Sequence, residues 1–149
     1  ISIFQYFINS QPKKIFSFGA SMLQKDISDS VMTTLEYKNG ISGHIFTSWL
    51  HPFKEHKIVI VGTNGMISYE DSSNKEIRFY DKKFSIINDQ INKIDKGYHI
   101  VDYANSAPLT NQMKYFIDHL DGNEVKISNG QHALEVLKIL IDASRQIEN

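Results

Sequence analysis

Residues 29–50, with the sequence DSVMTTLEYKNGISGHIFTSWL, decide the fold more clearly than any other stretch of this chain. Residues 29–38 alternate in the way that places every second side chain on one side of a β-strand. Asn39-Gly40 follows, and this dipeptide is typical of a type I′ turn, in which both central residues need a positive φ. The return strand is predicted over residues 41–50, with Ile45 and Trp49 on a shared face. The stretch therefore predicts an antiparallel hairpin.

The sequence on either side of this hairpin predicts further strands. Residues 57–61 form an apolar, β-branched run that is typical of a strand covered on both faces. The segment 62–65 is expected to turn the chain back into another strand. Residues 82–96 are polar and weakly patterned, which predicts a long loop with a short strand around residues 84–87. The remaining strands are expected over residues 14–22, 66–70, 76–81 and 98–103.

Three helices complete the predicted order. The first covers residues 1–8, and the second begins at Pro108, because proline is tolerated in a first helical turn. The last helix begins near Gly130. In each helix, apolar residues recur at the helical period and are expected to face the core. These stripes are Ile1, Phe4, Phe7 and Ile8; then Leu109, Met113, Phe116, Ile117 and Leu120; then Leu134, Leu137, Leu140 and Ile141.

These elements predict one α+β domain over residues 1–149. Its sheet is expected to be open and mostly antiparallel, with about six or seven strands and with helices packed on one face. The other face would stay apolar, since Val59 and Val61, or Ile58 and Ile60, must be buried against something. We expect that face to make oligomer or substrate contacts. The first helix begins without a capping residue, which predicts that sequence is missing upstream.

Composition excludes several classes of function. The chain has 149 residues, 41% of them hydrophobic, with 16 basic and 17 acidic side chains and a formal net charge of -1. This balance predicts neither nucleic-acid binding nor attachment to an anionic membrane. There are no cysteines, which excludes disulfides, thiolate zinc sites and a cysteine nucleophile and suits a cytoplasmic protein. No apolar run approaches the roughly 20 residues that span a bilayer.

The sequence contains no recognisable catalytic, cofactor-binding or metal-binding motif. The close glycine pairs, Gly40 with Gly43 and Gly62 with Gly65, lie between predicted strands, where no helix N-terminus would meet a phosphate. The six histidines have no familiar metal-ligand spacing. The serines at positions 21, 48 and 68 lie in strands and not on the sharp strand-to-helix turn that a hydrolase nucleophile needs.

One segment, residues 47–57, has a composition suited to ligand binding. It contains the only tryptophan, two histidines and two lysines at the end of a core strand. An aromatic ring, an imidazole and an ammonium group can bind a polyhydroxylated or phosphorylated ligand. Trp49 can equally be a core residue, and the lysines can be solvated. If any residues here touch a substrate, the sequence favours Trp49, His51 and Lys54.

The order of several short motifs resembles a known family. These motifs are residues 33–40 (TTLEYKNG), 48–55 (SWLHPFKE) and 59–66 (VIVGTNGM), followed by Pro108-Leu109 and Ser128-Asn129-Gly130 at the starts of two helices. Together they resemble the second domain of the glucose–fructose oxidoreductase, inositol dehydrogenase and MocA (Gfo/Idh/MocA) family over essentially the whole chain. The resemblance is greatest to the branch that is similar to UDP-N-acetylglucosaminuronate 3-dehydrogenases.

The resemblance implies a function for a larger parent protein. Members of the family carry an N-terminal Rossmann domain that binds NAD or NADP, and the second domain closes over the sugar and makes oligomer contacts. The family's catalytic lysine, histidine and aspartate would fall outside this chain. Ala107 stands where relatives often have a glutamate, which leaves the role of that acid in doubt. The resemblance thus implies a substrate-binding and oligomerisation domain, without its Rossmann domain and inactive as a fragment.

Two other interpretations remain open from the sequence. One is a non-enzymatic α+β dimerisation or ligand-binding module with no redox parent, and the other is a hydrolase with a dispersed site and a reactive serine. The sequence does not identify the sugar, the choice between NAD and NADP or the oligomer number.

Overall fold

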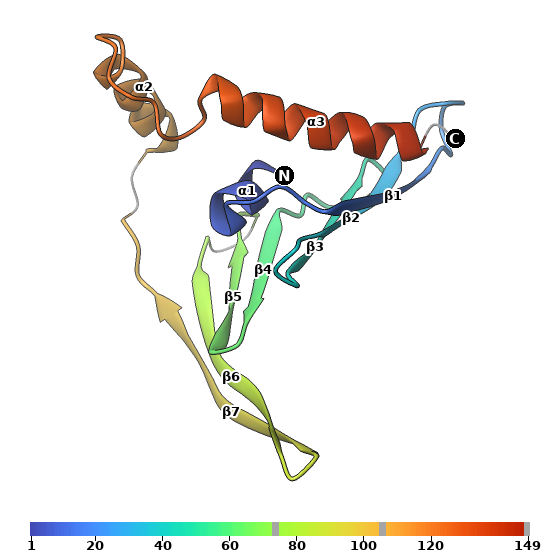
Figure 1. Ribbon diagram of the computed structural model, residues 1–149, viewed down its shortest axis with the longest axis vertical. Helices are drawn as coiled ribbons and strands as arrows, with labels where there is room; N and C mark the ends of the chain where they lie inside the picture. The colour runs from blue at the N-terminus through green and yellow to red at the C-terminus, as the bar shows by residue number, and fades with distance from the viewer. Residues whose placement is uncertain (73–74, 105–106, 148–149) are drawn as a thin grey trace. The chain divides into compact units, whose positions relative to one another are not determined.

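The computed structural model describes residues 1–72, 75–104 and 107–147. Its described residues contain three helices and seven strands, and every strand pairing is antiparallel (Figure 1), so the predicted α+β class is confirmed. The strands form two sheets instead of one, in the orders β1-β2-β3 and β4-β5-β6-β7. The chain divides into two compact units, residues 1–51 with 115–149 (unit 1) and residues 52–114 (unit 2).

Unit 1 contains the three-stranded sheet and two of the helices. In this sheet Leu35 lies opposite Ile15 on one side and Gly43 on the other, so these three residues share a face. We call this the inner face. The elements of unit 1 are α1 (Ser2–Ile8), β1 (Lys14–Ala20), β2 (Ser30–Glu36), β3 (Ser42–Ser48) and α3 (Gly130–Ile147).

The core of unit 1 lies between the inner face and the two helices. Leu35 has no exposed surface, and Ile139 of α3 is 2% exposed in the same cluster. Phe4 of α1 packs so closely on Gly43 that a Cβ added at that glycine would lie 2.1 Å from the Phe4 ring. A Cβ added at Gly19 of β1 would lie 2.4 Å from the Ile147 side chain of α3. Both helices therefore cover the inner face, as the sequence predicted for helices on one side of a sheet.

A side chain of α3 occupies the outer edge of β1. The Gln146 amide nitrogen donates to the carbonyl oxygen of Ile15 at 2.9 Å, and its oxygen accepts from the amide of Ser17 at 2.9 Å. Residues 15 and 17 are two apart, so both direct their backbone groups away from β2, where an edge strand has no strand partner. The Gln146 side chain thus makes the two hydrogen bonds that another strand would make.

The hairpin of residues 29–50 is confirmed, but its predicted turn type is wrong. Only Gly40 has a positive φ, at 82°, and Asn39 does not. The amide of Gly40 donates a hydrogen bond to the carbonyl oxygen of Tyr37 at 3.2 Å, and the amide of Tyr37 donates to the carbonyl oxygen of Ile41 at 2.9 Å. This pattern is a three-residue loop, in which a type I turn is followed by a glycine in the left-handed region. Asn39 instead accepts a hydrogen bond from the amide of Ile41 through its side chain, at 3.2 Å.

The predicted buried stripes of the last two helices are also wrong. On α3 the buried residues are Ile139 and Ala143, whereas Leu137 is 50% exposed. On α2 (Pro108–Asp118), which begins at the predicted proline, no residue is buried. The helix at residues 1–8 differs in one position, since Phe7 is exposed. The predicted stripe residues that the structure leaves exposed are Phe7, Leu109, Met113, Phe116, Ile117, Leu120, Leu134, Leu137, Leu140 and Ile141.

Unit 2 contains the four-stranded sheet. In chain order its strands are consecutive neighbours, so each pair forms a simple antiparallel hairpin. Val59, Ile60 and Val61 of the first strand are exposed, so the described residues do not provide the cover on both faces that the sequence predicted for this strand. The strands are β4 (Lys57–Gly62), β5 (Gly65–Glu70), β6 (Ile77–Ile87) and β7 (Gln90–Val101).

The loop predicted over residues 82–96 is a continuous two-stranded ribbon. β6 extends to Ile87 and β7 begins at Gln90, whereas β5 pairs with β6 only as far as Tyr80. The turn residues Asn88 and Asp89 have φ values of 52° and 59°, as a two-residue turn with two positive φ angles requires. The type I′ geometry expected at residues 39–40 therefore occurs here, where neither residue is a glycine. We call residues 82–96 the hairpin arm.

Substitutions on α3 test which of its apolar stripes is buried. Ile139→Ala is expected to lower the free energy of unfolding by about 2–5 kcal/mol, because it removes methylene groups from the core. Leu137→Ala, the matched change on the same helix, is expected to cost about 1 kcal/mol or less. Urea unfolding followed by circular dichroism measures both. Equal losses would contradict the observed orientation of α3.

Gln146→Ala tests the side-chain contact at the edge of β1. It removes two hydrogen bonds that water can replace, so we expect a loss of about 1 kcal/mol in the free energy of unfolding. Hydrogen exchange at the Ser17 amide should become faster in this variant. Gln131→Ala, at the other end of α3, should leave that exchange rate unchanged. An unchanged Ser17 rate in Gln146→Ala would show that the contact does not persist in solution.

Candidate functional site

Two of the three predicted ligand-contacting residues lie together at the end of β3 in unit 1. Trp49 follows the last residue of β3, and its side chain is 84% exposed, which rules out the interpretation of Trp49 as a core residue of this chain. The His51 ring lies 6.4 Å from the Phe46 ring, measured between centroids, in an edge-to-face arrangement. The indole is therefore a large apolar surface that is open to a ligand.

A buried carboxylate holds the backbone beneath Trp49. Asp29 is 5% exposed, and its carboxylate accepts hydrogen bonds from the amides of Met22 at 2.6 Å and Leu23 at 2.8 Å. The carbonyl oxygen of Asp29 accepts from the amide of Trp49 at 2.8 Å. One residue thus ties the loop after β1 to the end of β3. These bonds fix the backbone from which the indole extends.

Lys54, the third predicted residue, belongs to unit 2 and is exposed. It lies in the segment before β4, without helix or strand structure. Its contact with a ligand stays a prediction.

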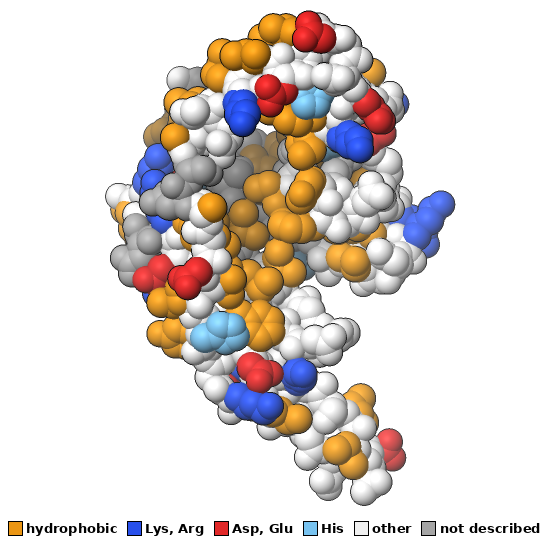
Figure 2. Space-filling view, turned by 90° about the vertical axis from the view of Figure 1, so that its left-hand side faces the viewer, with side chains coloured by type: hydrophobic (Ala, Val, Ile, Leu, Met, Phe, Trp, Pro, Cys, Tyr) orange, Lys and Arg blue, Asp and Glu red, His pale blue; other side chains and the backbone are white. Residues whose placement is uncertain are grey.

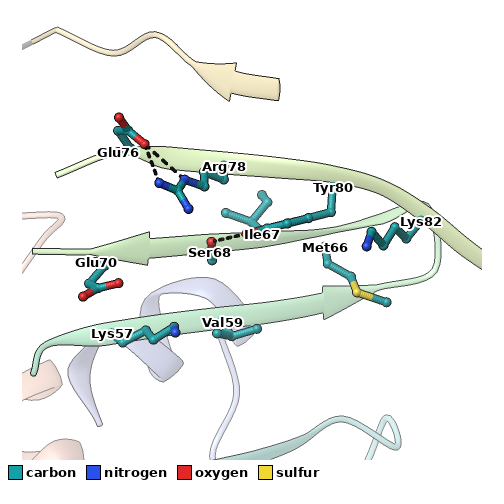
Figure 3. Close-up of a pocket in the computed structure, with 10 residues that line it drawn as sticks. All are labelled: Lys57, Val59, Met66, Ile67, Ser68, Glu70, Glu76, Arg78, Tyr80 and Lys82. Atoms are coloured by element: carbon teal, nitrogen blue, oxygen red, sulfur yellow. Dashed lines mark hydrogen bonds and ion pairs between the residues drawn. The ribbon is translucent and has the colours of Figure 1, made fainter. Parts of the chain in front are cut away.

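A second candidate site is a hollow on one face of the four-stranded sheet in unit 2 (Figure 3). The hollow has a volume of about 360 Å³ and is open to solvent. The alternate residues of β6 supply a polar wall, because side chains two apart on a strand point to the same side. The lining residues are Lys57, Val59, Met66, Ile67, Ser68, Glu70, Glu76, Arg78, Tyr80 and Lys82.

The polar groups of the hollow are partly engaged with one another. The Arg78 guanidinium donates to the Glu76 carboxylate through two nitrogens, at 3.1 and 2.9 Å, and lies 5.6 Å from the Tyr98 ring centroid. The Ser68 hydroxyl donates to the Tyr80 hydroxyl at 3.4 Å. This hydrogen bond lowers the pKa of Tyr80, and the nearby charge of Arg78 adds to the effect. The groups favour binding a polar ligand, because guanidinium and hydroxyl groups can contact carboxylates, phosphates or sugar hydroxyls.

The chemistry of the hollow is that of hydroxyl, carboxylate, ammonium and guanidinium groups. No histidine lines the hollow. Within residues 1–72, 75–104 and 107–147, no three histidine, aspartate or glutamate side chains gather in a way that would hold a metal ion.

The sequence analysis did not identify the hollow. The usable signal was the alternation of Glu76, Arg78, Tyr80 and Lys82, which places four polar side chains on one face of a strand. Lys82, the last of the four, lies beyond residue 81, where that strand was predicted to end. In the described part of the chain, no helix has the length and apolar character needed to cross a bilayer.

Comparisons with known proteins agree with the resemblance found in the sequence. Residues 1–68 match the family model described as the GFO/IDH/MocA C-terminal domain. No curated protein matches the chain. Among solved structures, two crystal forms of the UDP-N-acetylglucosamine 3-dehydrogenase GnnA from Acidithiobacillus ferrooxidans are similar, with a TM-score of 0.80 and 13% and 14% sequence identity. The match covers 99% of this chain and 44% of the GnnA chain.

A further similar structure is that of the WlbA dehydrogenase from Bordetella pertussis, in complex with NADH and UDP-GlcNAcA. It has a TM-score of 0.61 and 14% sequence identity, and the match covers 97% of this chain and 39% of the WlbA chain. The chain thus spans less than half the length of these enzymes. At such low identity the likeness establishes the fold alone. The sequence match adds to this likeness: residues 1–68 of this chain match the model of the GFO/IDH/MocA C-terminal domain.

Proposed function

We propose that this chain is the substrate-binding domain of an NAD(P)-dependent dehydrogenase that acts on a nucleotide-linked sugar. The family match over residues 1–68 is the observation that carries the proposal. The likeness of the fold to two nucleotide-sugar dehydrogenases supports it. We also propose a cytoplasmic location, which the absence of cysteines in this chain suits.

The described residues do not fit a dinucleotide cofactor. Gly40 and Gly43 flank the start of β3, in the hairpin between β2 and β3, and Gly62 and Gly65 flank the hairpin between β4 and β5. A pyrophosphate is held where a glycine-rich turn leads from a strand into a helix N-terminus. We therefore assign NAD or NADP to a Rossmann domain of the parent protein, and we propose that this chain alone is inactive.

We further propose that the sugar ring packs on Trp49, with His51 and Lys54 contacting its polar groups. The support is the exposed indole on a backbone that Asp29 holds in place. A sugar presents a face of C–H groups that suits an aromatic ring, and its hydroxyl or phosphate groups suit an imidazole and an ammonium group.

Because Trp49 is the only tryptophan, its fluorescence reports directly on this contact. We expect UDP-N-acetylglucosamine to change the Trp49 emission, and calorimetry to show no heat of binding with NAD. Trp49→Ala, which has no tryptophan fluorescence and is measured by calorimetry, should bind the nucleotide sugar about tenfold more weakly, which corresponds to the loss of one aromatic contact. Phe84→Ala, which removes an exposed aromatic ring from the hairpin arm, is the control and should have no effect. Tight binding of NAD by this chain would overturn the assignment.

We also propose that the parent protein is a homo-oligomer that uses the outer face of the three-stranded sheet. On this face Met32 lies between Phe18 and Phe46, and all three are exposed. A contiguous row of large apolar side chains on a sheet is typical of an interaction surface. Its two-fold self-association would bury the row in one step.

Phe18→Asp tests this surface. The charge would be buried without a partner in an oligomer, so we expect at least a tenfold weaker self-association in sedimentation velocity. Leu23→Asp makes the same change at an exposed apolar residue outside the sheet and should have little effect. An unchanged sedimentation profile for Phe18→Asp would contradict the use of this face.

A further inference from the structure

The outer edge of β7 is a second, separate surface of unit 2. The strand order places β7 at the end of its sheet, with β6 as its only strand neighbour in the described chain. All twelve of its residues are exposed. Every second backbone amide and carbonyl of an edge strand points outward without a strand partner. β7 therefore presents a row of hydrogen-bonding groups that another strand can use.

The hairpin arm increases the need for such a partner. Beyond Tyr80 the arm consists of β6 and β7 alone, and an isolated two-stranded ribbon is at best marginally stable in water. Ile86 and Ile91 lie opposite each other on one face and are both 76% exposed. Figure 2 shows hydrophobic and charged side chains interspersed along the arm, at the lower end of the view. A third strand would cover one edge and stabilise the ribbon.

The turn of the arm determines which residues of β7 can pair outward. In a two-residue turn the fourth residue donates its amide back to the first, so Gln90 faces Ile87 of β6. The direction alternates along an antiparallel ladder. Ile91, Lys93 and Asp95 therefore direct their backbone groups away from β6. A partner strand must pair these residues with outward-facing residues of its own.

A second copy of β7 can pair its outward-facing residues with those of the first copy, but only in some registers. Two-fold antiparallel pairing must be centred on a single residue, because a centre between residues would pair outward with inward positions. A centre on Lys93 or Asp95 places like charges directly opposite each other, which is unfavourable. A centre on Ile94 places Lys93 of each copy opposite Asp95 of the other. It also places the two Ile94 side chains together, as a β-branched pair.

We propose that two copies of this chain pair edge to edge through β7, in the antiparallel register centred on Ile94. Asp95 already lies 3.1 Å from both Lys82 and Lys93 within its own chain. In the pair, each carboxylate gains the Lys93 of the other copy. Charges on an edge strand normally prevent pairing, and here they favour the register centred on Ile94 over those centred on Lys93 or Asp95, because it alone of the three pairs Lys93 with Asp95. The pairing uses a different surface from the outer face of the three-stranded sheet and does not depend on the proposed enzymatic function.

A single cysteine tests the register, because the chain has none of its own. In the proposed pair, residue 94 lies opposite its own copy at a non-hydrogen-bonded position, where Cα atoms are about 4.5 Å apart. That separation suits a disulfide. Full-length Ile94→Cys is therefore expected to form a covalent dimer under mild oxidation. Ile91→Cys is the matched control, since its two copies would be about 20 Å apart along the strands, and it should stay monomeric on a non-reducing gel.

Charge reversal tests the same pairing without a covalent bond. Lys93→Asp and Asp95→Lys should each weaken self-association of the full chain about tenfold, since each places like charges opposite in the pair. Mixed in equal amounts, the two variants should recover association, because every opposing pair is then of opposite sign. Lys83→Asp, a reversal of the same size on β6, is the control and should have little effect. Circular dichroism would confirm that each variant is folded.

The possible outcomes separate this pairing from the other proposals. A wild-type chain that is monomeric at all concentrations in sedimentation velocity would overturn the pairing. Association that Phe18→Asp abolishes and the charge variants leave unchanged would also overturn it, while supporting the sheet face. Equal cross-linking of Ile94→Cys and Ile91→Cys would show nonspecific contact and reject the register.

Discussion

The packing of α3 on the inner face of the three-stranded sheet is the constraint on which unit 1 depends. Leu35 and Ile139 come from positions about a hundred residues apart in the chain, and they meet in the same core cluster. The close approach of Phe4 to Gly43 brings α1 against the same face. A three-stranded sheet cannot bury its apolar side chains by itself, so the last helix must return before the first hairpin is stable. The end of β3, and with it Trp49, is positioned by this assembly.

The strands could be predicted from the sequence because alternation is a local property. The hairpin of residues 29–50 is an example, since its apolar positions repeat every two residues and Asn39-Gly40 marks the turn. The type of turn could not be predicted, because it depends on how many residues the loop uses. For the same reason the turn at residues 88 and 89 was not predicted, because the surrounding ladder holds these two non-glycine residues at positive φ. The strands of that ladder were not predicted, because charged residues such as Lys93 and Asp95 are typical of loops.

The orientation of the helices was not determined by their sequence pattern. α3 has apolar residues on more than one side, with Ile139 and Ala143 in one stripe and Leu134 and Leu137 in another. Periodicity shows that both stripes exist and does not say which one meets the sheet. The candidate sites show a similar limit. The composition around Trp49 was informative, whereas the hollow around Arg78 requires three strands to be placed side by side.

The Gln146 contact has a consequence for the solubility of the protein. A sheet with two open sides can add molecules without end, as happens in fibrils. The Gln146 amide already engages two backbone groups on the free side of β1, those of Ile15 and Ser17, so it competes with any strand that would extend the three-stranded sheet in that direction. A single glutamine near the end of the last helix thus disfavours polymerisation through the free edge of β1.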